Sequence, residues 1–349
     1  MRGSVQTRMK HLKIAYAMNA SLPDITREDA RRLTHLNLAF GLIREGMLDL
    51  SGLGNLGLVS RIRKWNPSLR IVLSVGGWGA GGFSEMARTE EGRWQFACSV
   101  RRAVDEHGLD GVDIDWEYPC SDLAGIVASP RDRENFTHLL RALRRQLGPE
   151  RILSIAAGAG EYFVRGTQMD QVAKLTDYVQ LMTYDMRSGF CRQAGHHAAL
   201  TATAGDDSGL NTCDVVRMFQ RAGVPAEKIV VGAAFYARRW LGVPNVNHGL
   251  LQQAGSVGLG GPHFDEITDE FIEKNRFEQF WDADAQAAYL WNGSEFISFE
   301  TPEAIRLKCE YVRREGLLGI MYWEHGCDST RALLGAIDTA FAGENEQTE

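Results

Sequence analysis

Three acidic side chains occupy alternate positions in residues 109–119, and most of the positions between them are apolar. This period of two predicts a β-strand that ends at Pro119, with Asp113, Asp115 and Glu117 on one face about 7 Å apart. Carboxylates so close raise one another's pKa, so the row costs stability unless protons are shared. A strand that bears this cost is a candidate for acid–base chemistry. The alternative is a solvated strand face without a chemical role.

The residues around these acids decide between the two interpretations. The string D-G-V-D-I-D-W-E-Y-P at 110–119 resembles the signature of the family 18 glycoside hydrolases, the chitinases and their relatives. The string S-V-G-G at 74–77 resembles the family's S-x-G-G element, and M-T-Y-D at 182–185 resembles its M-x-Y-D element. The resemblance runs from residue 14 to residue 328, which is most of the chain.

The resemblance implies hydrolysis of the β-1,4 bonds between N-acetylglucosamine units of chitin or chitooligosaccharides. It also implies a substrate-assisted, retaining mechanism, in which the sugar's own N-acetyl carbonyl attacks the anomeric carbon. Glu117 is then the expected proton donor, and its neighbour Asp115 is expected to raise its pKa. Asp115 would orient the N-acetyl group, with Asp113 behind it. Tyr184 would donate a hydrogen bond to the acetyl oxygen.

Further candidates lie near the ends of predicted strands and are implied by the same resemblance. Trp323 would form an apolar floor under the sugar. Asp185 and Arg238 would hold the distorted sugar or its neighbour. The candidate substrate-binding residues are Tyr16, Phe40, Trp78, Met182, Asp185, Tyr236, Arg238 and Trp323. Ala234 and Ala237 stand where the family commonly has Pro and Gly, so the backbone that aims Arg238 departs from the family's pattern.

Eight apolar runs of strand length must position these residues. The runs are 12–18, 35–42, 70–75, the acidic strand, 152–157, 178–184, 229–235 and 318–323. Helical spacing separates many of them, at 28–33, 58–65, 89–107, 132–147, 213–222 and 302–315. This alternation predicts parallel strands covered by helices, and eight units predict a (β/α)₈ TIM barrel. A doubly wound sheet is the alternative, but no G-x-G-x-x-G follows the first strand.

One segment interrupts the alternation. Residues 239–300 are rich in glycine and aromatic residues, with strand-like pieces at 287–291 and 295–298 joined by an Asn292-Gly293 turn. We interpret this segment as a small α+β insertion between strand 7 and helix 7. The expected domains are therefore a catalytic barrel of residues 12–238 and 301–342, an insertion domain of 239–300, and flexible termini at 1–11 and 343–349.

Composition limits the partners of this globular chain. Of its 349 residues 24% are charged, and the net charge of −7 argues against nucleic acid or an anionic membrane as a partner. No cofactor is expected, and no metal, because the adjacent His196 and His197 cannot easily face one ion. We expect a monomer that acts on a neutral oligosaccharide.

The location of the protein stays open at this point. The six cysteines form no C-x-x-C pair, so one or two disulfides are expected only if the protein is exported, and free thiols otherwise. Residues 1–12 contain no apolar run of signal-peptide length, and no later window is apolar enough to span a membrane. The sequence as written indicates a cytoplasmic protein, or an extracellular one if a signal has been removed.

Two other functions fit the same motifs. Some relatives of this family are sugar-binding lectins that retain the barrel but lose the acid, and Glu117 argues against that class. Others are endo-β-N-acetylglucosaminidases that act on N-glycan cores and share the acidic strand. A glycosyltransferase that uses D-x-D with a metal is a more distant alternative.

Overall fold

The computed structural model describes residues 11–257 and 260–342. The expected flexible termini therefore lie outside the described residues, apart from His11. Eight parallel strands form a closed barrel, in the order β1-β13-β8-β7-β6-β5-β4-β2, which a β1–β2 pairing completes. The strands are β1 (Leu12–Met18), β2 (His35–Arg44), β4 (Arg70–Gly76), β5 (Gly111–Asp115), β6 (Ile152–Gly158), β7 (Tyr178–Met182), β8 (Ile229–Ala234) and β13 (Gly319–Trp323). The predicted (β/α)₈ barrel is confirmed.

Barrel strands are apolar because both of their faces are covered. Strand β8 reads Ile-Val-Val-Gly-Ala-Ala and is buried along its whole length, as is β5. Helices pack outside, so alternation of polar and apolar residues has no role in most of these strands. The aspartates of β5 are therefore acids inside a protein core and not on a solvated face.

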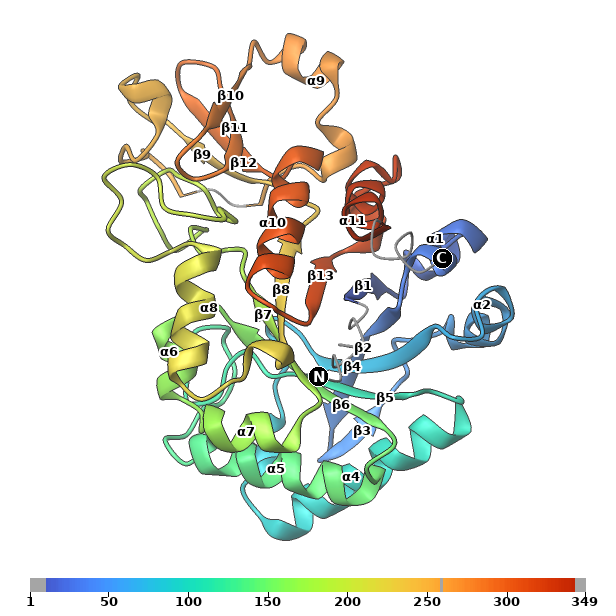
Figure 1. The fold of residues 1–349 in the computed structure, drawn as a ribbon. Coiled ribbons are helices and arrows are strands. Elements are labelled where there is room, and N and C mark those ends of the chain that lie inside the picture. The colour runs from blue at the N-terminus through green and yellow to red at the C-terminus, as the bar shows by residue number, and fades with distance from the viewer. Residues whose placement is uncertain (1–10, 258–259, 343–349) are drawn as a thin grey trace, which may run out of the picture.

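The helices form the outer layer of the barrel (Figure 1). They are α1 (Arg27–Arg32), α2 (Val59–Trp65), α3 (Phe83–Ala87), α4 (Glu90–Glu106), α5 (Asp132–Leu147), α6 (Glu161–Arg165), α7 (Met169–Leu175), α8 (Thr212–Arg221), α10 (Pro302–Arg314) and α11 (Ala332–Ala342). The six predicted helices are present to within two residues at each end. Helices α3, α6, α7 and α11 were not predicted. The first three have only five to seven residues each. Helix α11, A-L-L-G-A-I-D-T-A-F-A, lacks a polar face that would show a period.

A second, antiparallel sheet follows β8 in the chain and precedes α10. Its strands, in the order β10-β11-β12-β9, are β9 (Arg238–Leu241), β10 (Glu278–Asp282), β11 (Ala287–Trp291) and β12 (Glu295–Phe299), together with α9 (Asp269–Lys274). Figure 1 shows this group in orange at one end of the molecule, away from α4, α5 and α7. The predicted hairpin between β11 and β12 is confirmed, and Gly293 in its turn has a φ of 96°.

The connection between β7 and α8 packs against this second sheet. Ala194 belongs to the same apolar cluster as Trp240, Tyr289 and Phe296. The backbone N–H of Leu200 donates to the carbonyl of Ala285 at 3.2 Å. A loop that precedes the insertion by some forty residues in the chain therefore holds it in place. The aromatic pattern of 239–300 did not indicate this contact.

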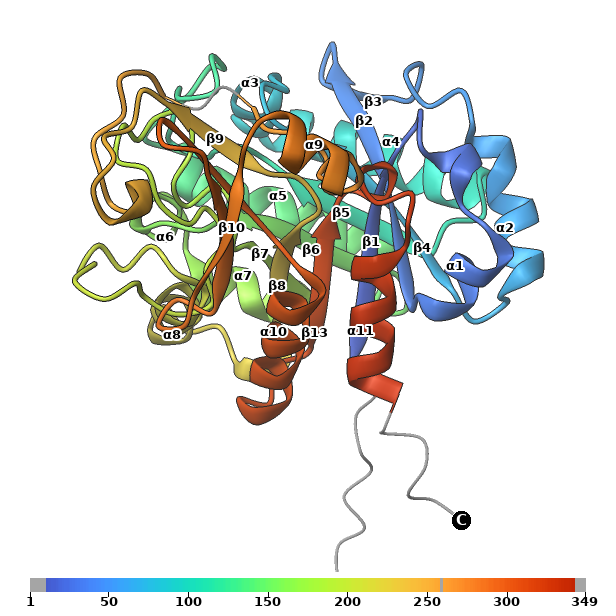
Figure 2. The same cartoon turned by 90° about the horizontal axis from the view of Figure 1, so that it is seen from above.

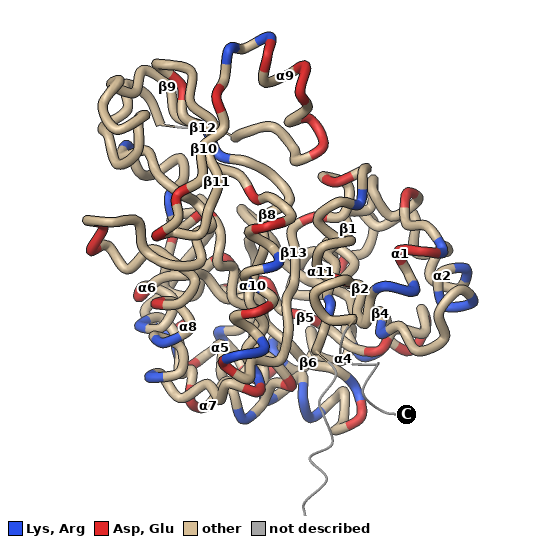
Figure 3. Tube along the Cα trace, turned by 45° about the horizontal axis from the view of Figure 1, so that its top comes forward, with Lys and Arg blue, Asp and Glu red and all other residues tan. Residues whose placement is uncertain are grey.

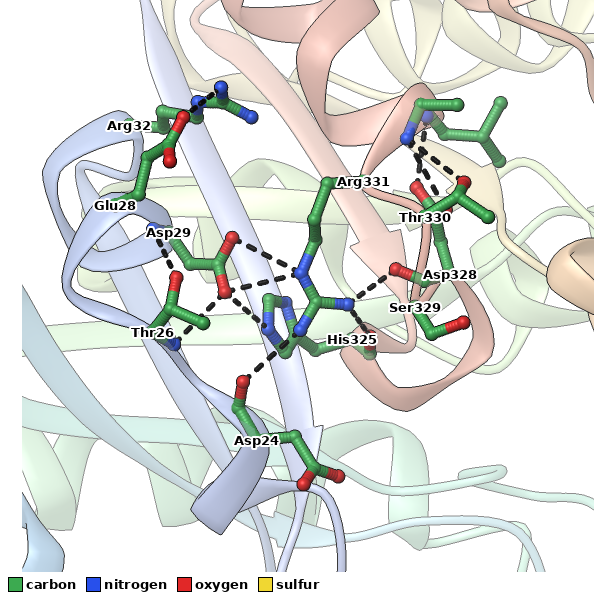
Figure 4. Close-up of polar contacts among 12 residues, drawn as sticks. Asp24, Thr26, Glu28, Asp29, Arg32, His325, Asp328, Ser329, Thr330 and Arg331 are labelled. Carbon is green, nitrogen blue, oxygen red and sulfur yellow. Dashed lines mark hydrogen bonds and ion pairs between the residues drawn. The ribbon is translucent and has the colours of Figure 1, made fainter.

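The first and last units of the barrel lie side by side in Figures 1 and 2, where α1 is next to α11. Polar contacts join them (Figure 4). The Nε of Arg331 donates to both carboxylate oxygens of the buried Asp29 of α1, at 3.1 Å each, and His325 Nε2 lies 3.4 Å from the same carboxylate.

A short hairpin strand, β3 (Met47–Asp49), extends β2 beyond the barrel and was not predicted.

Charged residues of both signs are interspersed over the outer helices (Figure 3). Within residues 11–257 and 260–342, no helix combines the length and the apolar character needed to cross a membrane.

Candidate active site

The acidic strand is shorter than its sequence period suggested. Strand β5 ends at Asp115, so Glu117 lies two residues beyond it, and the prediction of a strand that continues to Pro119 was wrong. The end of β4 approaches the backbone of Asp115 closely. The N–H of Gly77 donates to the Asp115 carbonyl at 2.9 Å, and a Cβ on Gly76 would lie 1.9 Å from that same oxygen. Only glycine fits at position 76, whose φ is +124°.

Asp113 is fully buried and receives four hydrogen bonds from four different strands. Its Oδ2 accepts from Tyr16 and Ser74, each at 2.8 Å. Its Oδ1 accepts from Ser154 at 2.7 Å and from Gln180 Nε2 at 2.9 Å. Burial raises the pKa of Asp113, and the four donors oppose that rise because they stabilise the charged carboxylate.

Asp115 has the opposite environment. It is buried, 4% exposed, and its Oδ1 has no hydrogen-bond partner among the described residues. Burial raises its pKa well above the usual value, and repulsion from Glu117 and Asp113 raises it further. A buried polar atom without a partner costs free energy, and active sites are a common place for such a cost. The atom is available to a ligand that brings a hydrogen bond.

Glu117 carries a proton at mildly acidic pH. Burial raises its pKa to about 7, the charge of Asp185 raises it as well, and a hydrogen bond with Tyr118 lowers it. The sequence led us to expect Asp115 as the cause. Instead, removal from water is the largest cause for Glu117, and the repulsion between Asp115 and Glu117 raises the pKa of Asp115. Either way, Glu117 has the protonation state of a general acid near neutral pH.

An ion pair closes one side of the site. The Nε and Nη2 of Arg238, the first residue of β9, donate to the two carboxylate oxygens of Asp185. Burial alone would raise the pKa of Asp185, but His197 and Arg238 outweigh it and hold the pKa well below the usual value. The Arg238 guanidinium also lies over the ring of Tyr236, 4.9 Å from its centroid. The Pro and Gly that the family has near this arginine are therefore not needed to bring it to Asp185.

Aromatic rings form the base of the site. Trp323 and Phe40 stack with centroids 5.3 Å apart and planes 15° from parallel, and the Tyr16 ring lies 5.7 Å from Trp323. Tyr184 contacts Met321 through its hydroxyl, 3.9 Å from the sulfur, and its ring meets that of Tyr236 edge-on at 6.1 Å. These rings surround the acids with apolar surface, which is the environment that raises their pKa values.

A second aromatic group begins at the residue after Glu117. The Tyr118 ring lies 6.2 Å from Trp78, and Trp78 lies 5.9 Å from Phe190. Trp78 is 52% exposed and Phe190 is 69% exposed. Two large rings that meet each other from separate loops and face solvent mark a binding surface.

Of the twelve predicted site residues, eleven lie in the barrel strands or in the loops that follow them, and Arg238 begins β9. Met182 is the least informative: it is buried at the end of β7. The residues that contact the site and were not among the predicted site residues are Ser74, Tyr118, Ser154, Gln180, Phe190 and His197. Ser154 and Gln180 are polar residues inside apolar runs, and that signal could have found them.

His197 supports the ion pair from inside the protein. It is fully buried, with Nδ1 3.6 Å from Asp185 Oδ1 and its ring 5.4 Å from that of Tyr236. Burial lowers its pKa, so the imidazole is neutral at pH 7. Its neighbour His196 turns away to Asp282, at 3.2 Å.

In the described part of the chain, no three His, Cys, Asp or Glu side chains are grouped as a metal ion would require. The six thiols are free.

Comparison with known proteins identifies relatives of one kind. The model of "Glycosyl hydrolases family 18" matches residues 13–328. Chitinase A1 of Niallia circulans is 34% identical over 304 residues, which cover 80% of this chain and 44% of that protein. Endochitinase of Manduca sexta is 27% identical over 297 residues, 78% of this chain and 53% of that protein. The chain therefore spans about half the length of these two relatives.

Solved structures of similar proteins share the fold. A family 18 N-acetylglucosaminidase from Paenibacillus barengoltzii is 49% identical with a TM-score of 0.93, and the match covers 95% of this chain and 99% of that one. A mutant class V chitinase from Nicotiana tobaccum, solved in complex with NAG4, is 25% identical with a TM-score of 0.83, and the match covers 95% and 99% of the two chains.

Proposed function

The chain belongs to family 18 of the glycosyl hydrolases, and we propose that it hydrolyses β-1,4 bonds between N-acetylglucosamine units of chitin or chitooligosaccharides. The observation that carries the proposal is the pair formed by Glu117 and Asp115. One is a carboxyl group with a pKa of about 7, and the other presents a buried oxygen without a partner. A protonated carboxyl group next to an acceptor oxygen that receives no hydrogen bond suits a substrate whose own amide group takes part in the reaction.

In the first step Glu117 donates its proton to the glycosidic oxygen, and the bond from that oxygen to the anomeric carbon breaks. The carbonyl oxygen of the N-acetyl group forms a new bond to the anomeric carbon, which gives a cyclic oxazolinium ion. The amide N–H donates to Asp115 Oδ1. The positive charge that forms on the ring favours the ionised form of Asp115 against the burial that raises its pKa, and the carboxylate then stabilises that charge. Asp113, held by its four donors, lies behind Asp115 on the same strand.

In the second step the ionised Glu117 takes a proton from water, and the water oxygen attacks the anomeric carbon. The carbon–oxygen bond to the acetyl group breaks, and the acetamide is restored. Two attacks on opposite faces leave the configuration retained. Glu117 returns to its protonated form, which matches a pKa near the working pH.

The aromatic groups support an assignment of the sugars on the two sides of the scissile bond. The stacked Trp323 and Phe40 suit the flat apolar face of the sugar that reacts, with Tyr184 donating to its acetyl oxygen. The Trp78 ring contacts both Phe190 and Tyr118, and Tyr118 is the residue after the proton donor Glu117. Trp78 and Phe190 therefore suit the leaving sugar. All these residues come from one chain, and we infer that a monomer is sufficient for activity.

A second candidate is the release of single N-acetylglucosamine units. The P. barengoltzii protein, at 49% identity, is described as an N-acetylglucosaminidase. The chemistry at the acid is the same in both cases, and only the length of oligosaccharide that the site accepts differs. A lectin would need no protonated Glu117, and an endo-β-N-acetylglucosaminidase would need room for a branched glycan.

One experiment separates these candidates. Purified protein is incubated with N-acetylglucosamine oligomers of two to six units, cellulose oligomers of equal length and a chitobiose-core glycan, and early products are identified. Cleavage of the chitin oligomers alone supports the proposal, and monomer as the first product from every length supports the second candidate. Equal cleavage of the cellulose oligomers would refute substrate assistance, and turnover of the core glycan alone would refute a chitin substrate.

A further inference from the structure

A groove on the outer wall of the barrel lies apart from the acids. It is about 660 Å³ in volume, lies between α4 and α5, and is lined by Glu90, Glu91, Arg93, Trp94, His138, Ala142, Arg141 and Arg145. The volume is that of a small-ligand site. Figure 1 shows the two helices together in the outer layer. The rings of Trp116 and Phe136 pack between β5 and α5, so this groove is separated from the catalytic face by the core.

Trp94 is the main feature of the groove. The side chain is 47% exposed, and no aromatic ring or cation of the described residues packs on its indole. An exposed indole inside a concave site is available for stacking on the apolar face of a ligand. It lies in the second turn of α4, which starts on the same side of the barrel as the carboxyl ends of the strands.

The polar groups of the groove are nearly balanced in charge. Three arginines and two glutamates line it. Burial lowers the pKa of His138, and the charges of Arg93 and Arg141 lower it further, so the imidazole is neutral at pH 7. Arg141 Nη1 lies 3.2 Å from His138 Nδ1. A groove with one net charge is a poor match for a polyanion, whose binding requires many cations along its length.

The chemistry of these residues fits a neutral ligand that has apolar faces and many hydroxyl and amide groups. Guanidinium groups donate hydrogen bonds, carboxylates accept them, and a neutral histidine can do both. We propose that the groove between α4 and α5 is a second, non-catalytic binding site for N-acetylglucosamine oligosaccharides, with Trp94 as its stacking platform. The proposal rests on the proposed function only for the identity of the sugar.

The test uses the full chain with Glu117→Gln, so that the ligand is not degraded. Titration calorimetry with a six-unit N-acetylglucosamine oligomer is expected to require two sites. Adding Trp94→Ala is expected to weaken the second site by about tenfold or more, as loss of a central aromatic contact does elsewhere. Adding Trp323→Ala in place of Trp94→Ala is expected to weaken only the catalytic site.

The controls separate the groove from general effects. Trp281→Ala removes a tryptophan of similar exposure, 42%, on β10, and both sites should remain. Trp94→Ala in the otherwise unchanged enzyme should leave kcat/KM on a disaccharide within twofold, while adsorption to chitin particles falls. A single site that Trp94→Ala does not change overturns this inference and leaves the proposed function intact. Binding of polyphosphate but not of the sugar in the groove also overturns it. Absence of any oligosaccharide binding overturns both proposals.

Discussion

Glu117 is the side chain on which the proposed chemistry depends, and Glu117→Gln removes its proton without changing its size. We predict that kcat falls by at least about 10²–10⁴-fold, the usual contribution of a general acid. Oligosaccharide affinity should be retained, since the aromatic rings and the Asp185–Arg238 pair are unchanged. Kinetics on a chitin oligomer together with calorimetry of the variant measure both.

The exposed Glu85 provides a matched control for that substitution. Glu85→Gln should keep the activity of the unmodified enzyme. A Glu117→Gln variant that turns over at an unchanged rate would remove the acid assignment, whatever the effect on binding.

Asp185 contributes, after burial, to the pH range in which Glu117 can donate. A general acid works when protonated, so kcat/KM should fall by about tenfold per pH unit above a midpoint near 7. The charge of Asp185 raises the pKa of Glu117. Asp185→Asn removes that charge and leaves Arg238 uncompensated, so both effects favour ionised Glu117 and the midpoint should move to lower pH. Asp284→Asn, at an exposed position, should not move it. A midpoint that stays in place or rises in Asp185→Asn would contradict the electrostatic argument.

The fit between β4 and β5 decides where the acids stand. Gly76→Ala would place a Cβ 1.9 Å from the Asp115 carbonyl oxygen, at a φ of +124°. Since the obstacle is backbone, the strands must move apart, and we predict that the free energy of unfolding falls by about 3 kcal/mol or more. The loss of activity should be larger than the loss of stability alone explains, because Asp115 and Glu117 move with the strand.

Gly57→Ala makes the same chemical change where no heavy atom lies within 4 Å. Denaturant unfolding should give it a stability within about 0.5 kcal/mol of the unmodified protein. Equal stabilities for the two alanine variants would show that the contact between β4 and β5 does not position the acids.

At the scale of the whole molecule, Asp29 links the first and last units of the barrel. It joins the first helix to the loop before the last one, through Arg331 and His325 (Figure 4). Asp29→Asn leaves the arginine without its charged partner, and we predict a loss of stability on the order of 3 kcal/mol. The neighbouring Glu28→Gln removes only an exposed contact with Arg32 and should cost less than about 1 kcal/mol.

The same carboxylate gives the stability a pH dependence. Burial raises the pKa of Asp29, but contacts with His325 and Thr26 outweigh it and hold the pKa well below the usual value. A depressed folded-state pKa stabilises the protein above the unfolded pKa of about 3.9, and this stabilisation is lost as the pH falls below it. Urea unfolding between pH 3 and 7 should therefore show a smaller acid loss for Asp29→Asn than for the unmodified protein. Parallel curves would contradict this role.

Much of the architecture follows from local pattern. The apolar runs and the helical spacing between them predict the barrel because strands covered on both faces need no polar residues. The spacing of Asp113, Asp115 and Glu117 likewise identifies the acids. Helix α11 escaped prediction because a helix that is apolar nearly all round has no period to detect.

The sequence by itself therefore determined what kind of fold the chain adopts and predicted which residues carry the chemistry, because both inferences rest on residue type and spacing. Only the tertiary structure decided the surroundings that shift the pKa of each acid. Asp113 is held by Tyr16, Ser74, Ser154 and Gln180 from four strands, whereas Asp115 is left without a partner at one oxygen. The pKa of a buried carboxyl depends on what surrounds it in space, and those neighbours lie tens of residues away along the chain.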